Sequence, residues 1–475
     1  MNPVEKKKKT IFISVSAPHI MRSMLILPGS VLERLISSGV LVVLLVPKET
    51  HQKMQEDFEG ENVLVEPIEV ELRVKKFSKK LYNFFATYLI FTEGARLFAW
   101  HGIRLDKPVA GGKRGRLLFP LKWLIANSFG KWRWFKLALM PRIGLLIYRE
   151  RPHRELFERY HPDLVYLPDV LSIQDVSVLR EAKRQNIQTL GMPGSWDHLP
   201  KRFEPFHVDE LLVWAEPFKK EAVELQGYVE GDVSIVGIPQ YDLFARTEYL
   251  LSREEFFKMF ELDPARKIIA LFSSGFYMPD DGDIADIIMS EMKEGKSLSE
   301  AQLFIRPYPA MPDEHKKFDV FADKPRVYLD WVAPQKVFPH KGNRWYPSTD
   351  GLIHLMNLMY HADVIISTYS SVNVEASAFL KPIININFDG YQIRPFSQSI
   401  KRFKHLSHYK HVLETGGVRN VNSKEELLES IREFLKNPNA NRERVLTLQK
   451  KLCSTLDGKA SERVVAHIFK TLGEV

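Results

Sequence analysis

Short runs of apolar, often β-branched residues alternate along the chain with longer stretches of helical periodicity. This alternation is typical of βαβ units, in which helices cover a parallel sheet. In the first half, the predicted strands are Thr10–Ser16, Leu41–Val46, Val63–Ile68, Leu164–Leu167, Glu210–Val213 and Val233–Val236. In the second half, they are Ile268–Ser273, Leu303–Arg306, Val327–Leu329, Val364–Ser367 and Ile383–Ile386. The pattern predicts an α/β fold with two parallel sheets.

The two groups of strands are separated near residue 240. Gly237-Ile238-Pro239 interrupts the pattern, and a second proline, Pro264, closes the helical stretch that follows. We therefore expect two Rossmann-like domains, residues 1–239 and residues 240–475, with the last helix a candidate to pack back on the first domain. Two such sheets in tandem predict a ligand between them, beyond the carboxyl ends of their strands.

The composition is that of a globular protein and excludes several other classes. Of 475 residues, 45% are apolar and 27% are charged, which disfavours disorder, collagen-like repeats and a coiled coil. The single cysteine, Cys453, excludes a disulfide framework and a cysteine-based zinc site. No window of 18 uncharged apolar residues is present, and the apolar run at 11–17 is too short for a signal peptide. We expect a cytoplasmic protein without a transmembrane helix.

The net charge of +8 is unevenly distributed along the chain. Residues 73–154 carry 19 Lys and Arg against three acids, a balance of +16, whereas the rest of the chain carries −8. We call this segment, which is also rich in Trp and Phe, the basic aromatic insertion. Its basic residues include Lys113, Arg114, Arg116, Lys122, Lys131, Arg133, Lys136 and Arg142.

Three interpretations of the basic aromatic insertion are open. Basic and aromatic residues together suit an anionic membrane surface, and they can also follow a nucleic-acid backbone. Alternatively, the helices pack on the core and keep their charges in solvent. We favour a membrane surface contacted through residues 113–154 and expect no nucleic-acid partner.

The stretch from residue 363 to residue 386 has the pattern of a phosphate-binding turn. The strand Val364–Ile366 leads into the hydroxyl-rich turn Ser367–Ser371 and then into a helix, Val372–Leu380. Ser370 or Ser371 is placed to cap this helix, whose first N–H groups would attract a diphosphate. Glu375, one turn further on, could accept hydrogen bonds from a ribose. Spacing alone leaves open a capped helix with an acid that complements its dipole.

The sequence lacks the fingerprints of other nucleotide and metal sites. Neither Gly-x-Gly-x-x-Gly nor the P-loop sequence is present, and no His-Glu-x-x-His or EF-hand pattern occurs. No Asp-x-Asp pair lies near the phosphate-binding turn. We therefore expect no cofactor and a reaction that needs no metal ion.

Several segments together resemble known proteins. The turn with Glu375 and Lys381-Pro382 resembles the donor-nucleotide site of GT-B glycosyltransferases, within them the branch similar to CDP-glycerol glycerophosphotransferases and surface-polysaccharide enzymes. Ile305–Pro309 is similar to an Arg-Pro-His-Pro motif of that class, with Tyr308 in place of the histidine. Leu271–Gly275 and Asp457–Arg463 also match segments of the class. The resemblance is strongest over residues 210–470 and implies a GT-B fold.

The resemblance implies that the second domain binds a nucleotide-activated donor. Arg306 would pair with a diphosphate, although a surface salt bridge is the alternative. Any role of the motif histidine would be lost or altered at Tyr308. The implied donor-binding residues are Ser273, Ser274, Gly275, Arg306, Tyr308, Ser370, Ser371 and Glu375.

Candidate acid-base residues follow strands of the first domain. In a GT-B arrangement His19 lies at the cleft and could act as a general base, with Arg22 one helical turn onward for an anionic acceptor. His19 could instead merely cap a helix. Ser195–His198 resembles a segment of surface-carbohydrate transferases. In this segment Asp197 and His198 are candidate catalytic residues, and Trp196 is a candidate for acceptor binding. The alternative is a purely structural segment, with a buried Trp and an Asp that forms a turn. Asp169 is a secondary candidate.

The predicted function is transfer of a sugar from a nucleotide-activated donor to a cell-surface polysaccharide or lipid-linked acceptor. Such an enzyme would act at the inner face of the plasma membrane. One alternative is polyol-phosphate transfer from a CDP-linked donor. Others are a non-hydrolysing nucleotide-sugar 2-epimerase and a degenerate GT-B module without activity.

Overall fold

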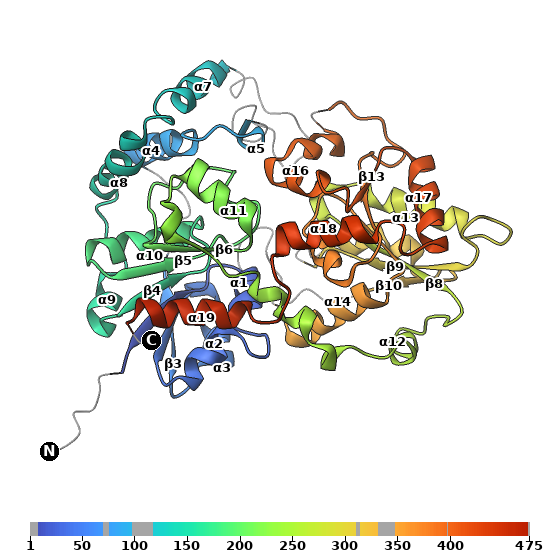
Figure 1. Ribbon diagram of the computed structural model, residues 1–475, viewed down its shortest axis with the longest axis horizontal. Coiled ribbons are helices and arrows are strands. Elements are labelled where there is room, and N and C mark those ends of the chain that lie inside the picture. The colour runs from blue at the N-terminus through green and yellow to red at the C-terminus, as the bar shows by residue number, and fades with distance from the viewer. Residues whose placement is uncertain are drawn as a thin grey trace.

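The computed structural model describes residues 8–69, 76–96, 117–309, 314–330, 347–396 and 398–473. They form two α/β domains that lie side by side (Figure 1). Each domain contains one parallel sheet with helices on its faces. The two sheets differ by one strand but share the same arrangement of their central strands.

The first sheet has seven strands in the order β3-β2-β1-β4-β5-β6-β7, all parallel. The strands are β1 (Thr10–Ser14), β2 (Leu41–Pro47), β3 (Val63–Ile68), β4 (Leu164–Leu167), β5 (Gln188–Gly191), β6 (Glu210–Val213) and β7 (Val233–Ile235). The second sheet has the order β10-β9-β8-β11-β12-β13, again parallel throughout. Its strands are β8 (Lys267–Phe272), β9 (Ala301–Arg306), β10 (Val327–Leu329), β11 (Val364–Ser367), β12 (Ile383–Ile386) and β13 (Arg419–Val421).

The helices of the first domain are α1 (Pro18–Met24), α2 (Val31–Ser37), α3 (His51–Phe58), α4 (Phe77–Thr87), α5 (Glu93–Ala95), α7 (Phe119–Asn127), α8 (Met140–Ile147), α9 (Arg154–Tyr160), α10 (Ile173–Arg184) and α11 (Glu216–Glu221). Those that follow the first sheet in sequence are α12 (Arg253–Met259), α13 (Asp281–Glu291), α14 (Thr349–His361), α15 (Val372–Ala376), α16 (Ser407–Leu413), α17 (Lys424–Lys436), α18 (Arg442–Cys453) and α19 (Ala460–Thr471).

The central strands are buried along their whole length, which explains why periodicity predicts them well. β1, β4 and β11 consist of buried residues only, as expected for parallel strands covered on both faces. The predicted α/β fold with two parallel sheets is confirmed. Two strands, β5 and β13, are missing from the two predicted groups. β13 has only three residues, of which Arg419 and Asn420 are polar, so it lacks the apolar run that marks the others.

The last helix, α19, returns to the first domain (Figure 1). It packs on α2 and on the strands β4 and β5. Its start is fixed by Asp242 in the 3-10 turn Pro239–Ala245, because this carboxylate accepts the N–H groups of Ala460 at 2.9 Å and Ser461 at 2.7 Å. The chain therefore passes between the domains twice, at two points that are hydrogen-bonded to each other.

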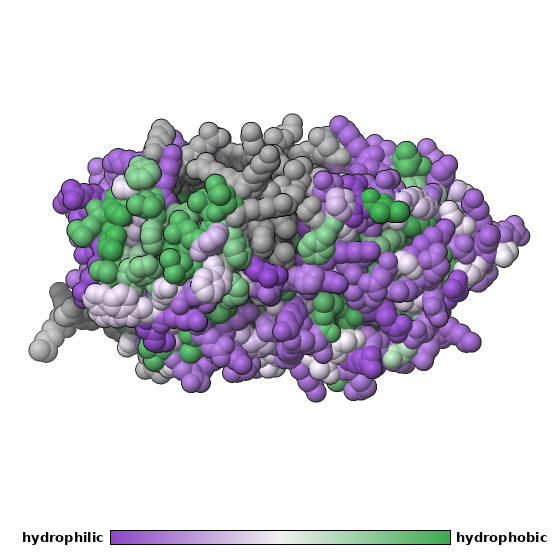
Figure 2. All heavy atoms as spheres, turned by 90° about the horizontal axis from the view of Figure 1, so that it is seen from above, coloured by the Kyte–Doolittle hydropathy of each residue, from purple (hydrophilic) through white to green (hydrophobic). Residues whose placement is uncertain are grey.

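The basic aromatic insertion is helical where the structure describes it. Figure 2 shows hydrophobic side chains gathered on one face of the first domain. Trp132 is 54% exposed and Trp134 53%, and their rings lie 5.7 Å apart. The exposed apolar residues of α4, α7, α8 and the adjoining turns are Phe77, Leu81, Leu117, Leu121, Trp123, Leu124, Phe129, Trp132, Trp134 and Leu146.

Two lysines that were predicted to belong to the basic surface of the insertion are buried instead. Lys122 is 4% exposed and lies over the Tyr88 ring. Lys136 is 7% exposed, donates to the carbonyl of Leu225 at 2.7 Å, and has its pKa lowered to about 8 by burial. Lys113, Arg114 and Arg116 lie outside the described residues. Within the described part of the chain, no helix is long and apolar enough to cross a membrane.

Candidate functional site

The predicted site residues lie at the switch points of the two sheets. In the first sheet the strand order reverses between β1 and β4, and in the second between β8 and β11. Ligands of open α/β sheets bind at such points, beyond the carboxyl ends of the strands. His19 and Asp169 follow β1 and β4, whereas Ser273 and Ser370 follow β8 and β11.

A cavity of about 270 Å³ lies between the loop that follows β5 and the switch point of the second sheet. We call it the interdomain cavity, because residues of both domains line it. From the first domain come Ser195, Trp196 and Asp197, and from the second Ser273, Ser274, Tyr277, Tyr308, Thr368, Tyr369, Ser370, Ser371, Phe403, Leu406 and His408. Seven predicted site residues are thus brought together. Thr368 and Tyr369 belong to the predicted hydroxyl-rich turn but were not among the predicted site residues, and no local motif marks Tyr277 and His408.

The wall formed by the second domain is rich in hydroxyl groups, but not all of these are available. Ser273 donates to Asp281 at 2.6 Å and contacts Glu314, and Ser274 donates to the carbonyl of Thr368 at 3.0 Å. Ser371 occupies the N-cap of α15 without a side-chain cap hydrogen bond. Its hydroxyl is therefore the best placed of these serines to contact a ligand.

Gly275 supports this wall without lining the cavity. It has a φ of +63°, a conformation that glycine adopts without strain, and its N–H donates to the Ser273 hydroxyl at 3.1 Å. Gly275 therefore shapes the loop, and the structure does not place it at the cavity as the predicted donor contact required.

Arg306 is not an exposed cleft cation, contrary to its predicted donor contact. It is buried at the end of β9 and paired with Asp330, which also contacts His354 Nε2 at 3.1 Å. Burial alone would raise the pKa of Asp330, but Arg306 and His354 hold it below its ordinary value. The guanidinium already has a buried partner, so the predicted alternative to a donor contact, a salt bridge, describes Arg306 better. The salt bridge is buried, however, and not at the surface.

Glu375 and Arg22, predicted to contact the donor and the acceptor respectively, contact each other. Their side chains form an ion pair of 3.2 Å between α15 of the second domain and α1 of the first. Glu375 is 3% exposed, so its carboxylate is enclosed at this contact between the domains. The pair links the two domains beside the switch points.

In the first domain, Asp169 lies between two histidines. His198 Nδ1 is 3.1 Å from Asp169 Oδ1, and His19 Nε2 is 3.5 Å from Asp169 Oδ2. Burial alone would raise the pKa of Asp169, but His198 and His19 lower it below its ordinary range. A carboxylate that holds the ring of a histidine is the arrangement that orients a general base. Asp169, only a secondary candidate in the sequence, is the centre of this cluster.

A second buried acid supports Asp169 from behind. Asp175 Oδ2 accepts the backbone N–H of Asp169 at 2.9 Å, and Asp175 Oδ1 accepts the hydroxyl of Ser14 at 2.7 Å. Burial and the neighbouring Asp169 raise the pKa of Asp175 to about 8. A neutral Asp175 at pH 7 leaves the negative charge of the pair on Asp169.

The predicted segment Ser195–His198 connects the histidine cluster to the interdomain cavity. Asp197 lines this cavity and pairs with Lys201, and its Oδ1 is 3.9 Å from His198 Nε2. Burial alone would raise the pKa of Asp197, but Lys201 and nearby histidines hold it well below its ordinary value. Trp196 is buried against His408 of the second domain, with ring centroids 4.8 Å apart. The buried-Trp alternative therefore describes Trp196.

The described residues contain no group of three or more His, Cys, Asp or Glu side chains arranged to hold a metal ion. The chemistry that the site displays is thus that of histidines, carboxylates and hydroxyls.

Comparison with known proteins gives one family match and several structural ones. The CDP-glycerol:poly(glycerophosphate) glycerophosphotransferase family matches residues 341–470. No curated protein matches the whole sequence at a significant level. The family match covers the phosphate-binding turn, and so confirms the predicted resemblance in the second domain.

Solved structures match the fold over almost the full chain. A glycosyltransferase from Rickettsia africae has a TM-score of 0.51 at 11% identity and covers 99% of this chain and 100% of its own. UDP-GlcNAc 2-epimerase from Neisseria meningitidis, bound to UDP-GlcNAc, has a TM-score of 0.53 at 11% identity and covers 97% and 100%. A variant of the wall teichoic acid polymerase TagF has a TM-score of 0.51 at 11% identity and covers 99% and 90%.

The chain has the GT-B fold. The matches to these structures extend over 97–99% of the chain and so take in both parallel sheets and the last helix, which returns to the first domain. At this level of identity the likeness shows the fold, and the chemistry follows from the side chains at the two switch points.

Proposed function

We propose that this GT-B protein transfers a sugar from a nucleotide-activated donor to an acceptor in cell-surface polymer synthesis. The observation that carries the proposal is the interdomain cavity, with hydroxyl groups from the second domain on one side and a histidine–carboxylate cluster beside the other. Neutral hydrogen-bond donors suit a nucleotide diphosphate, and a carboxylate-held histidine suits an acceptor hydroxyl.

His19 is the proposed general base. Its Nε2 faces Asp169, so Nδ1 is the ring nitrogen left to accept a proton. Both nitrogens of His198 face carboxylates, those of Asp169 and Asp197, which makes it a positioning residue. The acceptor oxygen would bond to the anomeric carbon as its proton passes to His19. The bond from that carbon to the diphosphate breaks, and a nucleoside diphosphate leaves.

The leaving group would be stabilised without a cationic side chain. None of the lining residues of the interdomain cavity is Lys or Arg, and Arg306 is paired with Asp330. The hydroxyls of Ser371 and Tyr308 are the proposed contacts of the diphosphate, since both residues line the cavity. Charge on the leaving oxygens would thus be met by hydrogen bonds.

A second function, transfer of a polyol phosphate from a CDP-linked donor, is favoured by the family match at residues 341–470. The same base would serve, but the acceptor oxygen would bond to phosphorus and CMP would leave. The two reactions therefore differ in the nucleotide they release. One gives a nucleoside diphosphate and the other a nucleoside monophosphate.

A donor screen followed by product analysis tests both functions. Thermal-shift measurements with UDP-, GDP-, CMP- and CDP-linked donors should show stabilisation by at least one. In ³¹P NMR of that donor with an acceptor, release of UDP or GDP indicates sugar transfer, and release of CMP from a CDP-linked donor indicates polyol-phosphate transfer. An epimerase would convert UDP-GlcNAc at C2 without releasing nucleotide. No stabilisation by any nucleotide would overturn the enzyme proposal. Activity unchanged by EDTA would support the metal-independent reaction.

We also propose that the exposed face of the basic aromatic insertion contacts an anionic membrane at the cytoplasmic side. Trp132 and Trp134 are exposed, and Arg133 between them is exposed as well. Aromatic rings at a lipid interface and a basic residue near phosphate groups each favour binding. Lys122 and Lys136 are excluded from this surface by their burial.

Vesicle sedimentation tests the membrane proposal. Replacement of both Trp132 and Trp134 by Ser should abolish salt-sensitive binding to vesicles that contain phosphatidylglycerol, and Arg133→Glu should weaken it. Tyr391→Ser, at an exposed aromatic residue of the second domain, is the matched control. Equal binding by the double variant and the control would refute the membrane contact.

A further inference from the structure

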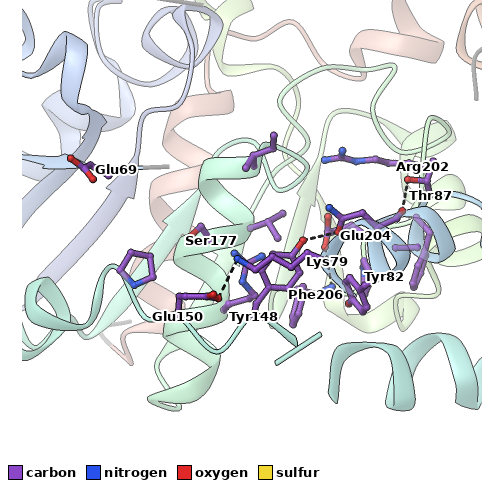
Figure 3. Close-up of a pocket in the computed structure, with 18 residues that line it drawn as sticks. Glu69, Lys79, Tyr82, Thr87, Tyr148, Glu150, Ser177, Arg202, Glu204 and Phe206 are labelled. Atoms are coloured by element: carbon purple, nitrogen blue, oxygen red, sulfur yellow. Dashed lines mark hydrogen bonds and ion pairs between the residues drawn. The ribbon is translucent and has the colours of Figure 1, made fainter. Parts of the chain in front are cut away.

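A second cavity, of about 440 Å³, lies within the first domain between α4, α10 and the loop that follows β5. Figure 3 shows Lys79, Tyr82, Tyr148, Glu204 and Phe206 grouped around it. We call it the insertion cavity, because α4 and Tyr148 belong to the basic aromatic insertion. It shares no lining residue with the interdomain cavity.

The walls of the insertion cavity are largely apolar. Tyr82 and Ala86 of α4 face Val176 of α10, and Phe203 and Phe206 close the far side. The opposite face of α4 exposes Phe77 and Leu81 to solvent. The cavity therefore lies directly beneath the exposed apolar surface of the insertion. Its volume is within the range of natural small-molecule sites, about 300–1,000 Å³.

One charged group of the cavity has no hydrogen-bonded or ion-paired partner among the described residues. Arg180 of α10 lies over the Tyr148 ring at 4.2 Å and near the Phe206 ring at 5.8 Å. Among the residues that the structure describes, its guanidinium forms no hydrogen bond and no ion pair. Burial lowers the pKa of Arg180. A half-buried guanidinium whose N–H donors are unused is well suited to bind the anionic group of a ligand.

The other charged residues of the cavity do not supply this anion. Glu150 pairs with Lys79 at 3.2 Å. Glu204 accepts the backbone N–H of Phe206 at 3.3 Å and interacts with Arg202 and Arg180 without an ion pair to Arg180. Burial outweighs these interactions and raises the pKa of Glu204 to about 7, so that it is partly neutral at pH 7. Arg202 uses one N–H on the carbonyl of Leu171 and brings a second guanidinium to the cavity.

We propose that the insertion cavity binds an amphiphilic anion, a phosphate or carboxylate attached to an apolar chain or ring, with Arg180 as the anchor of its charge. The planar fork of Arg180 would bind two oxygens of the anion, and Arg202 would add a further donor. The apolar part would lie between α4 and α10, toward the exposed surface. The ligand is either a lipid whose headgroup enters from a membrane or a soluble phosphorylated compound of the same chemistry.

The insertion cavity lies close to the histidine cluster. Arg202 is four residues after His198, and it donates to Leu171, two residues after Asp169. A molecule anchored at Arg180 would therefore approach the proposed base from the first domain. The binding proposal itself does not depend on which donor the second domain uses.

Calorimetric titration with octyl phosphate below its critical micelle concentration tests the proposal. The wild-type protein should bind octyl phosphate at least tenfold more tightly than inorganic phosphate and than octyl glucoside, because both the charge and the chain are needed. Arg180→Gln should weaken octyl phosphate binding at least tenfold, and Ala86→Leu, which fills the cavity from α4, should do the same. Arg442→Gln, at an exposed residue of α18, should leave it unchanged.

Equal binding of octyl phosphate and octyl glucoside, or equal binding by wild type and Arg180→Gln, would overturn the proposal. The comparison of ligands on the wild-type protein keeps the test valid even if a variant does not fold. Flotation with vesicles that contain phosphatidic acid identifies the source. Lost flotation of Arg180→Gln indicates a lipid, and unchanged flotation with lost octyl phosphate binding indicates a soluble compound. Donor-induced thermal shifts, measured separately, report on the proposed transferase function alone.

Discussion

The two switch points of this protein have the same backbone plan but different chemistry. In the first domain, Asp163 before β4 accepts the N–H of Thr10 at the start of β1 at 2.9 Å. In the second, Asp363 before β11 accepts the N–H of Ile268 near the start of β8 at 2.8 Å. These equivalent aspartates fix the central strand pair in each sheet. The scaffold is therefore shared, and the difference lies in the loops that follow the strands.

The loops of the first switch point carry ionisable groups, and those of the second carry hydroxyls. His19, Asp169 and Asp175 lie at the first, whereas Ser274 and Ser371 lie at the second. Histidine and carboxylate groups can move a proton, and neutral donors can hold phosphate oxygens without titrating near pH 7. The comparison teaches that the proposed acceptor and donor sides are distinguished by side chains on one common fold.

The largest expected effect is at the ionisable switch point. His19→Gln should lower the rate of nucleotide release from the identified donor by roughly 10²–10⁴-fold, since glutamine cannot accept the proton. Its donor-induced thermal shift should stay as in wild type. His51→Gln, which keeps a donor to the carbonyl of Val65, is the matched control. A rate within threefold of wild type would show that His19 is not the base.

The next effect concerns the ion pair that joins the switch points. Glu375→Gln should destabilise the protein by about 3 kcal/mol, because it leaves Arg22 without its buried partner. The double variant with Arg22→Met should recover part of this loss. Denaturant titrations of both single variants and the double variant measure the coupling. Donor affinity in the Arg22→Met background shows whether Glu375 also contacts the donor, since a further loss on Glu375→Gln would require such a contact.

The buried acid behind Asp169 should give stability a distinctive pH dependence. The folded pKa of Asp175, about 8, is above its unfolded value, so the native state retains a proton that the unfolded state loses. Stability should therefore fall as the pH rises from 5 to 8, by about 1 kcal/mol per pH unit from this group. Asp175→Asn should remove that slope, as urea titrations across the range would show. Asp232→Asn, at an exposed site, should retain it.

The smallest effect is expected at the hydroxyl-rich switch point. Ser371→Leu removes one hydroxyl and fills part of the interdomain cavity, and should weaken donor binding about tenfold, a cost near 1.4 kcal/mol. Isothermal titration with the identified donor measures this change, and Ser37→Leu on the exposed face of α2 is the control. Unchanged affinity would place the donor elsewhere in the fold.

Most of the fold could be predicted because local sequence patterns report burial. Parallel strands such as Ile268–Phe272 are apolar without interruption, and helices with opposing polar faces separate them. The short β13 shows the limit of this signal, since a three-residue edge strand with two polar residues resembles a loop. Pairing with β12 makes it a strand, and pairing is not visible in local composition.

A site residue could be predicted only where the strand and turn next to it in the sequence decide its position. Ser370 and Ser371 follow an apolar strand and line the cavity, as their spacing indicates. Arg306 and Glu375 also follow strands, yet partners far along the chain, Asp330 and Arg22, already use their charges. In the same way Lys122 and Lys136 lie in a basic segment but are buried. Contacts between distant segments decide these cases, and one sequence does not display them.

The two passages of the chain between the domains restrict how the interdomain cavity can open. Asp242 ties the first passage to the start of α19 in the second, so both lie on one side of the molecule. Because the two attachment points are joined, one domain can rotate relative to the other about the line through them. Twisting or sliding of the domains past each other is opposed. The proposed donor and base would therefore approach and separate along a single fixed arc. Loss of α19 would remove both this second attachment and the helix that packs on β4 and β5 of the first sheet.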